Sequence, residues 1–128
     1  ARKTLWPLTK QYGVGVLDMF AVRRALSQPE RLKEVCAELV RNGAMAGAAV
    51  NEADPLGFLL RETDAASLPE AAYRFCRHEQ GVDVVLTGTG NLGHLKENLS
   101  AILKPPLPKP ALDKLERLFG GLDYLTGN

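Results

Sequence analysis

The stretch that most restricts the fold of this 128-residue chain is residues 82–99, VDVVLTGTGNLGHLKENL. It begins with a short apolar run, rich in β-branched residues and interrupted by one charge at Asp83, which is typical of a strand buried on both faces. The run stops at Gly88, and a stripe at helical spacing follows, made up of Leu92, Leu95, Leu99 and Ile102. The stretch therefore predicts a buried strand, a glycine turn and a helix, in that order.

The turn itself has two possible uses. Gly88, Thr89 and Gly90 can adopt positive φ and expose backbone N–H groups, and Asn91 is a good N-cap for the helix that follows. Free N–H groups and the positive end of the helix dipole attract phosphate. A tight connection that binds no ligand fits the same residues about equally well, because a lone G-x-G-x-x-G pattern is a weak signal.

Gly88, Gly90 and Gly93 have the spacing of the Rossmann dinucleotide fingerprint. That fold requires a second parallel strand after the helix, ending in an acidic residue about 20 residues beyond the glycines. Here three prolines within residues 105–108 exclude a buried central strand, because each removes a backbone donor. Asp113 lies at about the right distance but opens a helix instead. The Rossmann interpretation therefore fails.

Composition sets the class of protein. The chain is 45% hydrophobic with a net charge of +1, which predicts one soluble globular unit spanning residues 1–128. The near balance of charge argues against nucleic acid as a partner, since Arg23 and Arg24 make only a small basic cluster. There is no apolar run long enough to span a membrane and no signal-peptide pattern, so we expect a cytoplasmic protein without a membrane partner.

The residues that bind metals are few and scattered. Cys36 and Cys76 lie on separate apolar helix faces without C-x-x-C spacing, which favours buried, reduced thiols over a metal site or a redox pair. His78 and His94 are far apart along the chain. The sequence therefore predicts no metal site.

The rest of the chain adds one more strand and several helices. A second apolar run, VGVLDMF at residues 14–20, predicts a buried strand formed by Val14, Val16, Leu17 and Met19. Residues 44–67 are rich in small residues and predict a long loop with a helical turn. Helices are expected over residues 4–11, ending at Gly13; 29–41, ending at Asn42-Gly43; 68–80, capped by Ser67 and ending at Gly81; and 110–121.

Strands that alternate with helices, each strand apolar throughout, indicate a parallel α/β architecture. Only two strands are expected, however, and a two-stranded parallel sheet that must be covered on both faces is not stable by itself. Ala1 in the place of an initiating methionine, and a start within a helix, also suggest that the chain is part of something larger.

Three segments carry a resemblance to a known family. They are YGVGVLDMFAVRRAL, then LPEAAYRFCRHEQGVDVVLTGTGNLGHLKENLSAILKPPLP, and the short helix before YLTGN. Together they resemble the C-terminal part of aldo-keto reductases, which are NADPH-dependent oxidoreductases built on a (β/α)₈ TIM barrel. The resemblance covers most of the chain outside residues 43–66, and its most specific part is GTGN followed by HLKENL. It implies that the chain supplies strands seven and eight of such a barrel, with their helices.

The resemblance also implies a binding site for the nicotinamide dinucleotide. Gly88, Thr89 and Gly90 would contact the phosphate region of its adenosine end, in the loop where such barrels commonly bind phosphate. Glu97 and Asn98 would face the adenine. Many family members have an arginine against the 2′-phosphate of NADPH at the position of His94. Because histidine cannot form the arginine fork, this departure leaves the choice between NADPH and NAD open.

The end of the first strand contributes two more residues under the same resemblance. Met19 and Phe20 would lie near the pyrophosphate or the nicotinamide, although polar residues are frequent there in the family and Phe20 is a second departure. A ligand role is not the only interpretation of Met19, Phe20 and His78. Plain packing or surface exposure is favoured over a ligand role for these residues by about two to one.

The resemblance implies no catalytic residue in this chain. The tyrosine that donates a proton to the carbonyl substrate, and its lysine, aspartate and histidine neighbours, come from the first half of the family's barrel. None of the tyrosines here, Tyr12, Tyr73 and Tyr124, is assigned that role. We therefore expect an inactive segment that self-associates or complements a missing half. A non-enzymatic nucleotide-binding or regulatory module, or a standalone α/β domain without nucleotide function, would fit the same residues.

Overall fold

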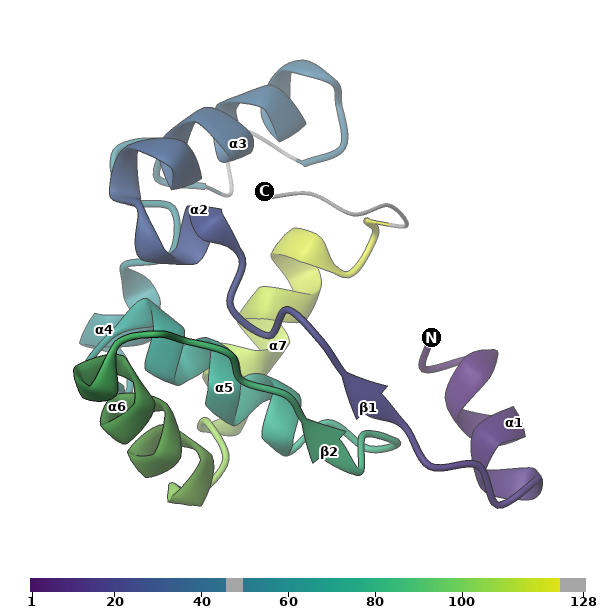
Figure 1. The fold of residues 1–128 in the computed structure, drawn as a ribbon. Helices are drawn as coiled ribbons and strands as arrows, with labels where there is room; N and C mark the ends of the chain where they lie inside the picture. The colour runs from purple at the N-terminus through teal and green to yellow at the C-terminus, as the bar shows by residue number, and fades with distance from the viewer. Residues whose placement is uncertain (46–49, 123–128) are drawn as a thin grey trace.

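A computed structural model describes residues 1–45 and 50–122. Within these residues the chain is a mostly helical small domain with a two-stranded parallel sheet (Figure 1). The helices are α1 (Leu5–Gln11), α2 (Arg24–Ser27), α3 (Pro29–Arg41), α4 (Phe58–Arg61), α5 (Leu68–Arg77), α6 (Leu92–Leu103) and α7 (Lys109–Phe119). Helix α5 lies at the centre and contacts α2, α4, α6 and the second strand. The parallel, α/β-like arrangement of strands and helices confirms the prediction at this level.

The sheet consists of β1 (Leu17–Asp18) and β2 (Val84–Val85), paired in parallel with Leu17 opposite Val84 and Asp18 opposite Val85. Both strands are much shorter than the apolar runs that predicted them. The prediction that they are buried was also wrong, because the side chains of Leu17 and Val84 are 60% and 47% exposed. Side chains of a two-stranded sheet are covered only where a helix packs on them, and within the described residues nothing covers this outer face.

Most helix boundaries follow the local signals in the sequence. Helix α3 begins at Pro29, and Gly43, with φ +69°, follows its end. Helix α5 begins after Ser67, whose hydroxyl accepts a hydrogen bond from the backbone N–H of Glu70 at 3.2 Å. Gly81 has φ +96° and lies directly against Trp6, so a side chain at this position would meet the indole ring. Helix α4 is the helical turn expected within residues 44–67, of which 46–49 lie outside the described residues.

Helix α5 is buried on more than one face. The helical spacing of Leu68, Ala72, Phe75 and Cys76 predicts that these four residues form its buried stripe, but all four are only partly buried. The most buried residues of α5 are instead Ala71, Tyr73 and Arg74. Ala71 belongs to the main core with α3, α4 and α7, whereas Tyr73 belongs to a second, smaller cluster with Ala21 and Ala101. Since α5 separates two cores, no single helical stripe describes its burial.

The apolar stripe of α6 lies mostly on the surface. Leu92 is 76% exposed and Leu99 61%, and Leu103 at the end of the helix is also exposed. Only Ala101 is buried, with Ile102 partly buried beside it. The helix is therefore amphipathic as expected, but its leucines face away from α5.

Arg74 is a cation buried in the interior, with a side chain that is 1% exposed. Its guanidinium donates to the backbone carbonyls of Pro105 at 2.9 Å and Pro106 at 3.4 Å. It also pairs with Asp64 at 2.8 Å and Glu70 at 3.2 Å, and Lys104 binds the same Glu70 carboxylate at 2.9 Å. This network joins α5 to the loop before it and to the proline segment between α6 and α7.

No helix in residues 1–45 and 50–122 has both the length and the apolar character needed to cross a lipid bilayer.

Replacing Arg74 tests how much the network contributes. We expect Arg74→Ala to lower the free energy of unfolding by about 3 kcal/mol or more, because it leaves carboxylates and carbonyls without their buried cation. Urea denaturation followed by circular dichroism measures the change. Arg77→Ala, at an exposed position on the same helix, is the matched control and should cost less than about 0.5 kcal/mol. Equal effects of the two substitutions would contradict the role given to Arg74.

The same network predicts a dependence of stability on pH. Burial raises the pKa of Glu70, but hydrogen bonds from Lys104 and Arg74 outweigh it and leave that pKa lowered. The pKa of Asp64 is lowered mainly by its hydrogen bond with Arg74. Carboxylates with lowered pKa values stabilise the fold above their unfolded pKa, which is about 4, and this stabilisation is lost as the pH falls through the folded values.

We therefore expect the free energy of unfolding to fall between about pH 5 and pH 2, and Glu70→Gln to make this fall smaller. Urea denaturation at several pH values checks it. Glu34→Gln, which removes an exposed carboxylate paired with Arg31 on α3, should leave the pH dependence unchanged. An unaltered slope in Glu70→Gln would contradict the prediction.

Candidate functional site

The candidate site lies where the two parallel strands end. The backbone N–H of Leu86 donates to the carbonyl of Asp18 at 2.9 Å, which continues the ladder beyond β2. Met19 and Phe20 follow β1, and residues 87–90 follow β2, so both segments leave the same edge of the sheet. The chain then enters α6 (Figure 1). The carboxyl ends of parallel strands are where ligands bind in α/β proteins.

The glycines of the turn are open to solvent. A side chain at Gly88 or Gly90 would meet no atom within 4 Å, and neither residue has the positive φ that the sequence allowed. Neither backbone strain nor internal packing therefore requires glycine at these two positions. What the two glycines do provide is room for another molecule to approach the main chain closely.

The hydrogen bonds around the turn leave part of it free. The Asn91 side chain caps α6 as predicted, accepting from the backbone N–H groups of Gly93 at 2.7 Å and His94 at 3.3 Å. The Thr89 hydroxyl accepts from the N–H of Asn91 at 3.1 Å. Among the residues that the structure describes, the N–H groups of residues 88–90 donate to no protein atom. These three donors, rather than the first turn of the helix, are the ones available to an anion.

Two predicted contacts on α6 are exposed and a third is already engaged. The side chains of His94 and Glu97 are exposed on the surface of the helix. The amide of Asn98 donates to the hydroxyl of Thr87 at 2.8 Å. The phenol of Tyr73 makes a further hydrogen bond to Thr87, also at 2.8 Å. The structure therefore brings Asn98 to the start of the turn, where its carbonyl oxygen is still available.

Thr87 and Tyr73 are the residues that sequence reasoning missed. Thr87 links α5, α6 and the end of β2 through one hydroxyl. The sequence shows a threonine between the apolar run and the glycines. It does not show the two hydrogen-bond partners of this threonine, because one lies on the helix before it and the other on the helix after it. The two contacts fix the beginning of the turn relative to both helices.

Met19 and Phe20 lie on the surface. Their side chains are 57% and 62% exposed, and the guanidinium of Arg23 lies 4.9 Å from the centre of the Phe20 ring. Phe20 has φ +62°, which is rare for an aromatic residue. Backbone strain of this kind is often found at functional sites. Both residues lie at the same sheet edge as the glycine turn.

The described residues contain no group of three or more side chains suited to a metal ion. Cys36 is buried as predicted, whereas Cys76 is only partly buried, and neither forms a disulfide. Burial raises the pKa of Cys36. Burial, together with a hydrogen bond to Asp18, raises the pKa of Cys76 to about 12. Both thiols therefore stay protonated at neutral pH and are poor nucleophiles.

No protein-family model, curated protein or solved structure matches this chain.

Proposed function

We propose that this chain is the C-terminal cofactor-binding segment of an NAD(P)H-dependent aldo-keto reductase, and that residues 88–90 bind a phosphate of the dinucleotide. The observation that carries the proposal is the pair of open glycines at the carboxyl edge of a parallel sheet, with three free backbone donors. A turn whose main chain is accessible and unpaired suits a phosphate, which needs several donors within a small space.

The helix that follows would supply the rest of the adenosine site. His94, Glu97 and Asn98 lie on α6, and Asn98 is held beside the turn through Thr87. A dinucleotide whose phosphate occupies the turn would extend its adenine along this helix. His94 would face a 2′-phosphate with one imidazole rather than an arginine fork, so we propose NADP(H) or NAD(H) without a strong preference.

The proposed reaction is reduction of a small aldehyde or ketone by hydride transfer, and it requires more than this chain. The hydride comes from the nicotinamide, and a general acid must protonate the carbonyl oxygen. We assign no residue of this chain to that role. The exposed outer face of β1 and β2 and the exposed leucines of α6 support a missing part, because further strands and helices would cover them. We also propose that the complete protein forms a full barrel, that another part of it complements this chain, and that it is cytoplasmic.

The alternative is a non-enzymatic module that binds a nucleotide for regulation, and the same turn supports it. The two proposed functions differ in what the rest of the native polypeptide must contain. The enzyme requires a proton-donating tyrosine and its lysine partner on other strands, in a native polypeptide of about 250 residues or more. The mass of the native polypeptide therefore separates them.

Nucleotide binding can be tested with adenosine 2′,5′-bisphosphate, which carries the adenosine end alone. We expect amide NMR shifts at residues 88–90 and in the first turns of α6. Gly88→Asp should weaken binding by about tenfold or more, because its carboxylate would repel the phosphate at short range. The matched control is Gly121→Asp, at a second glycine with open space around it. An absence of shifts in the turn at millimolar ligand, or equal effects of the two variants, would contradict the proposal.

Turnover tests the assignment of catalysis to the missing part. We expect no oxidation of NADPH above background when the 128-residue chain is mixed with an aromatic aldehyde, because no proton donor is assigned within it. Loss of NADPH absorbance measures the rate. Robust activity from this chain alone would show that the catalytic group lies within it and would overturn this part of the proposal.

A further inference from the structure

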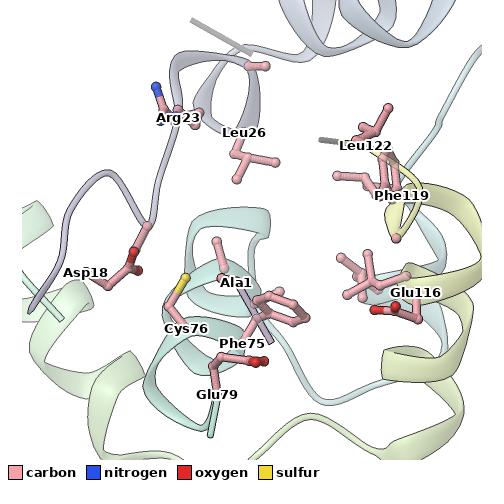
Figure 2. A pocket seen from close by; sticks show the side chains of 18 of the residues that line it. Ala1, Asp18, Arg23, Leu26, Phe75, Cys76, Glu79, Glu116, Phe119 and Leu122 are labelled. Carbon is pink, nitrogen blue, oxygen red and sulfur yellow. The ribbon is translucent and has the colours of Figure 1, made fainter. Parts of the chain in front are cut away.

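A second candidate site lies on a different face of α5, inside the helical part of the molecule. A cavity of about 840 Å³, open to solvent on one side, is lined by residues of α2, α3, α5 and α7 and by the N-terminal residues. In Figure 2, Leu26 extends into it from α2, Phe75 from α5, Phe119 from the end of α7 and Leu122 from the residues that follow α7. None of the eight residues predicted to bind the dinucleotide lines this cavity. Its size falls within the range of pockets that bind small molecules, about 300–1,000 Å³.

The inner wall of the cavity is apolar. It is formed mainly by core side chains, among them Leu32, Val35, Leu39, Leu56 and Leu59. The thiols of Cys36 and Cys76 also line the cavity, and both stay protonated at neutral pH. A wall of this kind offers an apolar molecule a surface on which to bury its own.

Charged side chains of both signs also line the cavity. Arg2 binds Glu79 through two hydrogen bonds of 2.6 Å and Glu116 through a third of 2.6 Å. Arg23 lies over the ring of Phe20, and Lys3 and Asp18 complete the charged part of the lining. Since both signs are present, this part of the lining favours neither an anion nor a cation.

From this arrangement we propose that the cavity between α2, α3, α5 and α7 binds an uncharged, apolar small molecule, separately from the dinucleotide turn. The apolar wall would supply most of the binding free energy through burial of ligand surface. The apolar wall would disfavour anionic and cationic ligands, because it offers a charged group few polar partners in exchange for the water that it loses.

The probe for the test is N-phenyl-1-naphthylamine, which is uncharged and fluoresces strongly in apolar surroundings. Trp6 is the single tryptophan of the chain and lies at the edge of the cavity. Energy transfer from Trp6 to the bound probe therefore reports binding close to this site. We expect saturable binding at one site per chain, and a negatively charged naphthalene sulfonate probe should bind more weakly by about tenfold.

Two variants distinguish probe binding in the cavity from probe binding to the exposed leucines of α6. Ala72 lines the cavity and is partly buried, so Ala72→Phe should fill part of it and weaken probe binding by about tenfold. Leu99→Ser is the matched control, because it removes an exposed leucine from the alternative apolar surface. It should leave probe binding unchanged. Weaker binding in Leu99→Ser but not in Ala72→Phe would overturn the proposal.

A readout without substitutions covers the case in which Ala72→Phe does not fold, as judged by circular dichroism. Cys76 lines the cavity, so a bound probe should protect it from a neutral disulfide reagent, which is used in large excess over hours because this thiol is protonated and reacts slowly. Mass spectrometry of the modified peptides distinguishes Cys76 from Cys36. We expect saturating probe to slow the modification of Cys76 by about tenfold or more, in proportion to the bound fraction. An unchanged rate would also overturn the proposal.

Discussion

The buried guanidinium of Arg74 links α5 to segments that lie before and after it along the chain. Leu107, in the proline segment between α6 and α7, packs into the same main core as Ala71 of α5. The carbonyls of Pro105 and Pro106 in this segment also accept hydrogen bonds from Arg74, while Asp64 and Glu70 balance the charge. Because a buried cation tolerates only a few arrangements of its partners, this network fixes where α7 begins relative to α5.

Both candidate sites depend on that central helix. On one side of α5, Tyr73 and Asn98 of α6 both form hydrogen bonds with the hydroxyl of Thr87. These bonds hold the beginning of the glycine turn in place, while its middle is open to solvent. On another, Phe75 and Cys76 form part of the wall of the apolar cavity. The first site offers unpaired backbone donors and suits an anion, whereas the second offers apolar surface and suits an uncharged molecule. The two sites therefore suit different ligands, and these ligands would not compete.

The sheet explains why the proposed function requires a larger assembly. Two paired strands of two residues each place the glycine turn and Phe20 at one edge, which is enough to form part of a binding site. They do not bury Leu17 or Val84, and the leucines of α6 are exposed as well. Strands of a parallel sheet are normally covered on both faces, so these exposed apolar side chains are the ones that further elements would cover under the proposed function.

Interactions between residues close together in the sequence were sufficient to predict most of the helices and the glycine turn. Ser67 and Asn91 cap their helices through contacts within three residues, and Gly43, which has positive φ, follows the end of α3, so the sequence alone predicted these boundaries. The predicted end of α5 at Gly81 was wrong, because the helix ends at Arg77. Burial could not be predicted in the same way. The pattern of Val84 and Leu17 indicates strands that can be buried, but whether they are depends on distant elements that the pattern does not contain. Arg74, the bond of Thr87 to two helices, and the cavity join residues far apart in the chain, and only the tertiary structure could decide them.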